Sequence, residues 1–238
     1  MTRTAQFSLP LLMPAQAQKH VTVNEALARL DAVAQLRIVS SSEPMPPSGA
    51  AEGESFLVPA GAGGEWGAKV GQIATRSNAG WVYVTPKAGW RAWEESSAGP
   101  LIFDGVAWLA DAVAVTPGGA ALVWRAYEFD HPISAGASSQ TGPVIPAGAL
   151  VVGITGRVVD EITGTGITGW RIGVPNGLDR YGTGLGVQKN SYVVGLSGSP
   201  VAYYVATPLH LQAEGGQFIG GRVRLCVCYC QLLPPRAV

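Results

Sequence analysis

Charged residues are scarce in this sequence. Only 13% of the chain is Asp, Glu, Lys or Arg, which is about half the usual share. The 16 basic and 16 acidic residues cancel, so the formal net charge at pH 7 is zero. Surfaces that bind nucleic acid need an excess of basic side chains. The composition therefore predicts no nucleic-acid partner.

Long apolar segments and a secretory leader are also missing. The chain has no run of 18 apolar residues, so we expect no transmembrane helix and no membrane insertion. Arg3 is not followed by an apolar segment before Pro10 and Pro14, which does not fit a secretory signal. We therefore expect the protein to be made and assembled in the cytoplasm.

Cysteine is rare, and its three copies stand close together at Cys226, Cys228 and Cys230. Alternate positions of a strand point to the same face of a sheet. A metal site would need a fourth ligand, for which His210 is the nearby candidate. Small buried thiols are the alternative that we favour, so we expect no metal and no other cofactor.

Catalytic motifs are lacking as well. Asp160 and Glu161 are adjacent, so on a strand they face opposite sides and do not form a glycosidase pair. Asp130 and His131 could belong to a triad, but no serine motif supplies the third member. G-x-S-x-G, phosphate-loop and H-E-x-x-H motifs are absent. We expect a protein that is not an enzyme.

An amphipathic helix is predicted near the N-terminus. Thr22 and Glu25 form a T-x-x-E capping box, so the helix should begin at Val23. Its narrow apolar seam repeats at 4-3-4 spacing and consists of Val23, Leu27, Leu30 and Ala34. About sixteen helical residues rise roughly 24 Å and are marginal alone. The seam therefore packs on its own domain or on copies of the chain, and we interpret it as an oligomerisation site.

The remaining chain reads as β-structure, so the fold class is mainly β with a short N-terminal oligomerising helix. After an anchor at 1–40, six short runs between turn residues predict a small Trp-rich antiparallel meander over 41–110. These runs are 55–58, 70–75, 81–85, 90–94, 100–103 and 107–110. Residues 111–121 read as a linker. Seven longer runs over 122–238 predict a C-terminal β-sandwich or jelly roll.

Aromatic residues provide the candidate binding site. Aromatic faces stack on sugar rings, but tryptophans also build the cores of small domains. Trp90 and Trp93 fall on opposite faces of one predicted strand, so one of them should face solvent. The segment 175–184 (PNGLDRYGTG) reads as a polar recognition loop or a plain hairpin connection. The predicted carbohydrate-binding residues are Trp90, Trp93, Trp170, Asp179, Arg180 and Tyr181.

Two stretches resemble a known family. The run QAQKH at 16–20 is followed by NEAL at 24–27, and GWRAW at 89–93 is followed by FDG at 103–105. Over about residues 5–110, the chain resembles an uncharacterised domain family of tail-fibre and head-spike proteins in alphaproteobacterial phages and gene transfer agents. The resemblance implies a homotrimer in a virion or phage-like particle, attached through its N-terminus to capsid or tail proteins.

These observations lead to one main hypothesis and two alternatives. The chain is expected to be a non-enzymatic fibre or spike that adheres to host capsular polysaccharide and is released by lysis. A polysaccharide-cleaving spike (a depolymerase) and a purely structural virion protein are the alternatives.

Overall fold

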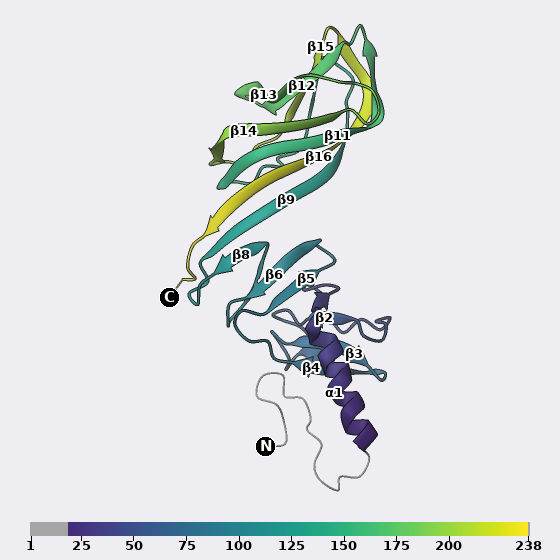
Figure 1. Cartoon of the computed structure of the whole chain (residues 1–238), viewed down its shortest axis with the longest axis vertical. Coiled ribbons are helices and arrows are strands. Elements are labelled where there is room, and N and C mark those ends of the chain that lie inside the picture. The colour runs from purple at the N-terminus through teal and green to yellow at the C-terminus, as the bar shows by residue number, and fades with distance from the viewer. Residues whose placement is uncertain (1–18, 238) are drawn as a thin grey trace. The chain divides into compact units, whose positions relative to one another are not determined.

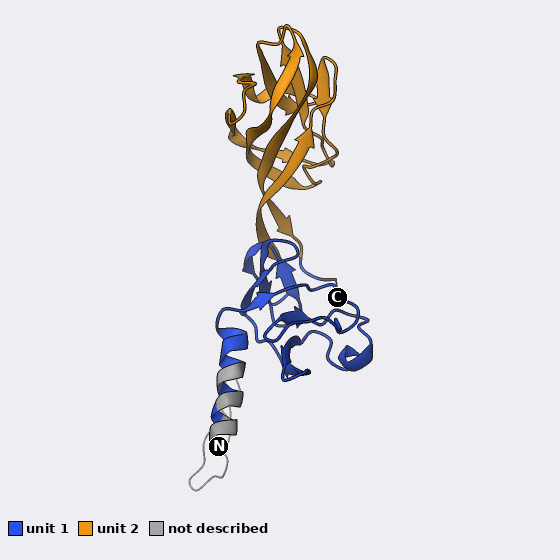
Figure 2. Cartoon of the chain, turned by 90° about the vertical axis from the view of Figure 1, so that its right-hand side faces the viewer, with its two compact units in different colours: residues 1–119, 235–238 blue, residues 120–234 orange. Residues whose placement is uncertain are grey.

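A computed structural model describes residues 19–237 of the chain (Figure 1). The chain forms two compact units, coloured separately in Figure 2. Unit 1 comprises residues 1–119 and 235–238, and unit 2 comprises residues 120–234. The chain therefore passes between the units twice. Strand β8 (Ala112–Val115) lies inside the segment that was predicted to be a linker.

Helix α1 spans Lys19–Ala34 and so begins four residues before the predicted Val23. The side chains of Thr22, Glu25 and Leu27 lie outside the described residues. Val23 and Leu30 are exposed, as is Ala34. The described part of the predicted seam is therefore uncovered in a single chain.

The six strands predicted in unit 1 are confirmed, but they form two sheets rather than one meander. The first sheet contains β2 (Ser55–Leu57), β3 (Ile73–Ser77) and β4 (Gly80–Val84). The second contains β1 (Arg37–Ile38), β5 (Arg91–Glu94), β6 (Gly99–Phe103) and β7 (Trp108–Ala110). The prediction of one meander failed because the consecutive strands β4 and β5 lie in different sheets. Strand β5 pairs instead with β6 and with β1, a two-residue strand that was not predicted.

Aromatic rings make up much of the core of unit 1. Trp66 is fully buried beside Phe56 and Trp81, with ring centroids 5.8 Å and 5.2 Å away. Trp90 and Trp108 pack against a second buried cluster that includes Ile73 and Leu101. Four tryptophans of unit 1 are therefore used for packing: Trp66, Trp81, Trp90 and Trp108.

Arg236, near the C-terminus, pairs with a buried turn of unit 1 that contains Asp104. The backbone N–H groups of Val106 and Ala107 donate to Oδ1 of Asp104 at 2.8 Å and 2.9 Å, and Arg236 pairs with Oδ2. Arg236 also donates from Nη2 to the carbonyl oxygen of Pro117 at 2.7 Å. Burial alone would raise the pKa of Asp104, but these donors outweigh it and keep that pKa below its usual value.

Replacing Arg236 with Gln should therefore lower stability and change its dependence on acid. We expect a loss of about 1–3 kcal/mol at pH 7, because the buried carboxylate of Asp104 loses a charged donor. In the parent, Asp104 stabilises the fold above its unfolded pKa, and this stabilisation is lost as pH falls through the lower folded pKa. Urea unfolding from pH 7 to 2 should show a shallower acid loss in the variant.

The exposed ion pair Arg37–Glu95 provides the control for that experiment. Arg37→Gln removes the same charge from unit 1 at a solvated site, where such pairs contribute little. Equal losses for the two variants would contradict a structural role for the Arg236 contact.

Two antiparallel sheets enclose one core in unit 2, which confirms a mainly β fold but does not establish a jelly-roll topology. Within unit 2, the strands of one sheet follow the order β14 (Tyr192–Tyr203), β11 (Ala149–Thr165), β16 (Gln217–Leu233) and β9 (Ala121–Pro132). The other has the order β10 (Ser138–Gln140), β15 (His210–Glu214), β12 (Gly169–Val174) and β13 (Gly177–Leu185).

Strand β16 has the two faces that its alternation predicts. Its core face carries the buried residues Val223, Leu225, Val227 and Tyr229. Arg222, Arg224 and the three cysteines occupy the opposite face, which we call the outer face of the sheet. The outer face of β14, β11, β16 and β9 is the surface on which the candidate site lies.

Candidate functional site

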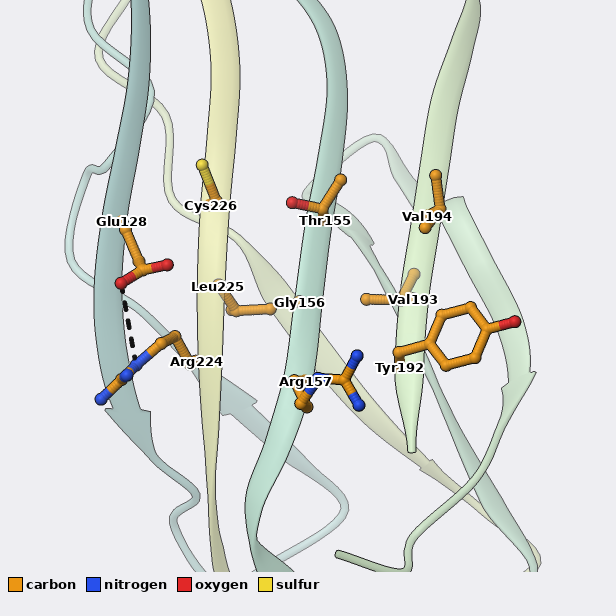
Figure 3. Close-up of a pocket in the computed structure, with 10 residues that line it drawn as sticks. All are labelled: Glu128, Thr155, Gly156, Arg157, Tyr192, Val193, Val194, Arg224, Leu225 and Cys226. Atoms are coloured by element: carbon orange, nitrogen blue, oxygen red, sulfur yellow. Dashed lines mark ion pairs between the residues drawn. The ribbon is translucent and has the colours of Figure 1, made fainter. Parts of the chain in front are cut away.

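A shallow pocket of about 450 Å³ crosses all four strands of the outer face (Figure 3). It arises from strand register. Arg224 of β16 pairs with Arg157 of β11, and Arg157 pairs with Tyr192 of β14. Directly paired residues of antiparallel strands share a face. Their side chains therefore form one row across the sheet, and Glu128 and Cys226 lie in the next row.

The row at β11 and β14 offers an aromatic ring and a guanidinium group. Tyr192 is 68% exposed, and the Arg157 guanidinium lies 5.9 Å from its ring centroid. Arg157 donates from Nη1 to the carbonyl oxygen of Asn190 at 2.9 Å. Within residues 19–237 it forms no ion pair with a carboxylate. Its remaining N–H groups are therefore available to a ligand.

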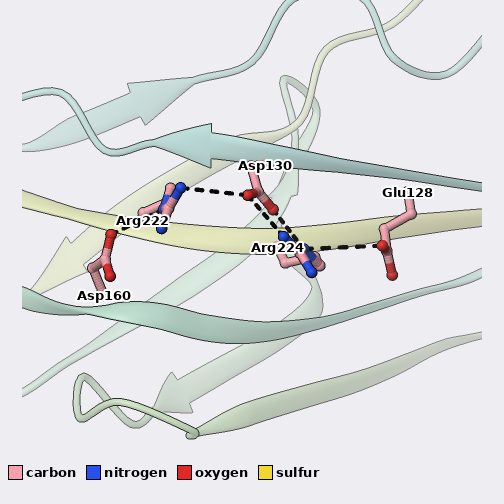
Figure 4. Close-up of polar contacts among 5 residues, drawn as sticks. All are labelled: Glu128, Asp130, Asp160, Arg222 and Arg224. Atoms are coloured by element: carbon pink, nitrogen blue, oxygen red, sulfur yellow. Dashed lines mark hydrogen bonds and ion pairs between the residues drawn. The ribbon is translucent and has the colours of Figure 1, made fainter.

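Acidic and basic side chains alternate on the outer face (Figure 4), and two of them, Glu128 and Arg224, line the pocket. Arg222 bridges Asp160 and Asp130, and Arg224 donates to both carboxylate oxygens of Asp130 at 2.6 Å and 3.0 Å. These bonds from Arg224 hold the pKa of Asp130 below its usual value. Oε1 of Glu128 lies 3.9 Å from Nε of Arg224, which is too far for a hydrogen bond. The carboxylate oxygens of Glu128 therefore remain available as hydrogen-bond acceptors.

The pocket therefore combines three kinds of group. The exposed face of Tyr192 can stack on the C–H face of a sugar ring. Arg157 supplies donors and Glu128 supplies acceptors for neighbouring hydroxyl groups. The three arginines and three carboxylates of this surface cancel in charge, which suits an uncharged polar ligand.

The three cysteines share one face of β16, as the alternation predicts, but they are half-buried rather than buried as expected. Sγ of Cys226 lies 4.0 Å from Sγ of Cys228. Burial, followed by the neighbouring Cys228, raises the pKa of Cys226 to about 11, so this thiol is protonated at neutral pH. The structure places His210 on β15 of the other sheet, and residues 19–237 contain no metal-ligating group of three or more side chains.

Two of the predicted sugar-binding residues are buried, which corrects their assignment to an exposed site. Trp170 and Tyr181 are each only 2% exposed. The indole N–H of Trp170 donates to the carbonyl oxygen of Gly186 at 2.9 Å, and the hydroxyl groups of Tyr181 and Tyr203 are 2.7 Å apart. Both side chains satisfy their polar atoms inside the protein and belong to the core of unit 2.

The recognition-loop interpretation of 175–184 is not supported, because most of the segment forms strand β13. Residues 175–176 form the turn of the β12–β13 hairpin, in line with the hairpin alternative. Asp179 and Arg180 are exposed on that strand. In unit 1, Trp90 packs against the core and Trp93 is 50% exposed. The six predicted residues therefore fall in two separate units, and Trp93, Asp179 and Arg180 lie at the surface of theirs.

Ser139 approaches the histidine that the sequence raised as a triad member. Nε2 of His131 lies 2.8 Å from Oγ of Ser139, which also accepts from the backbone N–H of Ser134 at 2.9 Å. Both side chains are buried, and burial lowers the pKa of His131. Asp130 points to the outer face toward Arg224 and does not orient His131. This arrangement favours a structural role in joining β9 to β10.

Tyr192, Arg157 and Glu128 were missed by sequence reasoning. Their strands were predicted, but only the register across β14, β11, β16 and β9 places the three side chains beside one pocket. The sequence signal that could have indicated Tyr192 is the alternation around Val193. Because Val193 is buried, its neighbours Tyr192 and Val194 lie on the outer face.

Comparison with known proteins gives limited similarity. No curated protein matches the chain. One solved chain, from "Cyanophage Pam1 capsid asymmetric unit", is 22% identical over 48% of this chain and 85% of that chain, with a TM-score of 0.31. A score this low does not establish a shared fold. Among the described residues, no helix is long and apolar enough to span a membrane.

A family match lies in unit 1. Residues 23–109 match the family described as "Protein of unknown function (DUF2793)". This segment falls within the stretch of about residues 5–110 on which the resemblance was based. An uncharacterised domain is therefore confirmed for that part of the chain.

Proposed function

We propose that this chain is a non-enzymatic fibre or spike protein of a phage-like particle or gene transfer agent, which adheres to polysaccharide on the host surface. In this proposal the N-terminal region attaches the protein to other capsid or tail proteins, and unit 2 binds the glycan. The resemblance of residues 5–110 to such proteins supports the place on a particle. The pocket on the outer face supports adhesion.

The observation on which adhesion rests is the exposed ring of Tyr192 beside Arg157. Because the Tyr192 ring is two-thirds exposed, folding leaves most of its apolar surface in water. Covering that surface with a sugar ring removes it from water, which favours binding. Arg157 and Glu128 flank the place where the hydroxyl groups of that sugar would lie. Trp93, Asp179 and Arg180 remain secondary candidates, because each is exposed.

The protein is also proposed to be a homotrimer, assembled in part through the seam of helix α1. Val23 and Leu30 are exposed in one chain, and a lone helix of 16 residues is marginal in water. One sugar in a shallow pocket binds weakly, but three linked sites bind a repeating polymer together.

Replacing Tyr192 with Ala should weaken binding to purified capsular polysaccharide at least about tenfold, because the stacking surface is lost. Tyr192→Phe keeps the ring and should bind nearly as well as the parent. Binding would be measured by biolayer interferometry on immobilised capsule, with far-UV circular dichroism to confirm folding. Trp93→Ala should have the smaller effect, since Trp93 lies outside the pocket.

Two results would contradict the proposal. Equal binding by the parent and Tyr192→Ala would exclude this pocket, and absence of binding to every host capsule would exclude adhesion. Release of oligosaccharide from the capsule would replace the proposal with the depolymerase alternative.

A further inference from the structure

Unit 1 contains a pocket of its own, which lies between the end of helix α1 and strand β5. Its volume is about 530 Å³. Val33 of the last helical turn lines it, together with Gln35 and Arg37 just after the helix and Arg91 and Trp93 of β5. We call this space the helix-end pocket. All the residues that line it belong to unit 1.

Strand pairing fixes the side chains that border this pocket. Arg37 of β1 is the parallel partner of Trp93, and the backbone N–H of Trp93 donates to the carbonyl oxygen of Leu36 at 3.0 Å. Arg91 and Trp93 are exposed, whereas Ala92 between them is buried. Alternate residues of a strand share a face, so these two side chains leave β5 on the same side, about 7 Å apart along the strand.

Trp93 provides a flat apolar surface at the pocket. Its side chain is 50% exposed, although tryptophan is highly buried on average. Within residues 19–237, no other aromatic ring and no cation stacks on it. An aromatic face stacks on the C–H face of a sugar ring, and the indole N–H can donate to a hydroxyl group. The exposed ring therefore suits a sugar.

The charge of the helix-end pocket is positive. Two arginines line it, and no Asp or Glu does. Nε of Arg37 pairs with Oε1 of Glu95 at 3.1 Å, whereas Arg91 forms no ion pair with a carboxylate of the described residues. A guanidinium group holds a carboxylate through two parallel N–H···O bonds. Arg91 therefore favours an anionic ligand, unlike the outer-face pocket, where carboxylates balance the arginines.

The end of helix α1 adds hydrogen-bond acceptors. The last four carbonyl groups of a helix have no partner inside it, and Val33 carries one of them. The amide of Gln35, which is exposed, both donates and accepts. The hydroxyl groups of a ligand can donate to these oxygens. An acidic sugar combines all three features, because it has a C–H face for Trp93, hydroxyl groups for the helix end and a carboxylate for Arg91.

We propose that the helix-end pocket binds an acidic sugar unit of a polysaccharide, of which a uronic acid is the simplest form. Trp93 stacks on the sugar ring, and Arg91 pairs with its carboxylate. This is a second glycan site, in unit 1, and it differs from the outer-face pocket because its ligand must carry negative charge. The inference rests on the proposed function only in taking the ligand to be a polysaccharide.

The test uses the full chain and tetragalacturonate as the probe. In ¹⁵N-labelled protein, the indole N–H resonance of Trp93, assigned by its loss in Trp93→Ala, should shift as the probe is added. Arg91→Gln should weaken binding at least about tenfold, because the carboxylate loses its bidentate partner. Raising the salt from about 20 mM to about 500 mM should weaken binding by the parent several-fold.

Arg76→Gln is the matched control, because it also removes an arginine beside a tryptophan of unit 1. Arg76 lies over the ring of Trp81 on the other sheet and does not line the helix-end pocket. This variant should bind tetragalacturonate as the parent does. Maltotetraose, which is uncharged, is the ligand control and should leave the Trp93 resonance in place.

Two results would overturn the inference. One is an unchanged Trp93 resonance at about 10 mM tetragalacturonate, where even a millimolar site is mostly filled. The other is equal binding of the probe by Arg91→Gln and Arg76→Gln. In either case, capsule binding that depends on Tyr192 would leave the proposed adhesion standing. Conversely, binding of the probe through Arg91 without any binding to host capsule would support this site and reject the proposed function.

Discussion

Replacing Trp66 with Ala is expected to destabilise unit 1 by about 3–5 kcal/mol, the range for deleting a large buried aromatic side chain. Trp66 is fully buried and contacts Phe56 and Trp81 through their rings. The cavity cannot close easily, because a strand positions each of these neighbours. Thermal unfolding followed by far-UV circular dichroism should show a midpoint for unit 1 lower by about 10–15 °C.

Two variants calibrate this result. Trp66→Phe keeps a ring and removes an indole N–H that has no partner among the described residues, so it should lose much less. Trp93→Ala removes a half-exposed side chain and should cost about 1 kcal/mol or less. If Trp66→Ala unfolds at the same temperature as Trp93→Ala, the aromatic cluster does not hold unit 1 together.

Replacing Gly195 with Ala is expected to destabilise unit 2 by about 3 kcal/mol, at the upper end for overpacking. An added Cβ would lie 1.9 Å from the carbonyl oxygen of Tyr181 and 2.8 Å from its Cα. Gly195 is held in β14 by its pairing with Ile154. Tyr181 cannot move away freely, because its ring is buried and its hydroxyl meets that of Tyr203.

Gly220→Ala is the matched control for this substitution. A Cβ at Gly220 meets nothing within 4 Å, so the change should be neutral or slightly stabilising through the unfolded chain. Urea unfolding of the parent and both variants measures the difference. Similar midpoints for Gly195→Ala and Gly220→Ala would show that β13 and β14 do not approach as closely as described.

The alternation of strand residues could be predicted because it depends on local chemistry alone. In β16, Val223 and Leu225 alternate with Arg222 and Arg224, and this pattern fixes both faces before any neighbour is known. The six strands of unit 1 were predicted from short runs between turn residues, which are also local. Their division into two sheets was not predicted, because nothing local shows that β4 and β5 do not pair or that β5 pairs with the distant strand β1.

Most of the candidate site could not be predicted from the sequence. Pro175, Asn176 and several glycines in 175–184 are typical of loops. In the structure Gly177, Gly182 and Gly184 lie within β13, and only a short turn precedes them. Aromatic residues present a related difficulty, because composition does not distinguish a buried ring such as Tyr181 from an exposed one such as Tyr192. Long-range register decides between them.

The double passage of the chain has a mechanical consequence. In the proposed fibre, tension on the binding unit must be transmitted to the base. Here the backbone connects the units at 119–120 and again at 234–235, and Ala121 pairs with Leu233 where the two connections enter unit 2. The two backbone connections therefore share the load. The second connection is anchored in unit 1 by Arg236, which pairs with Asp104 and donates to the carbonyl oxygens of Pro117 and Gly118. These contacts determine how long the second connection carries part of the load.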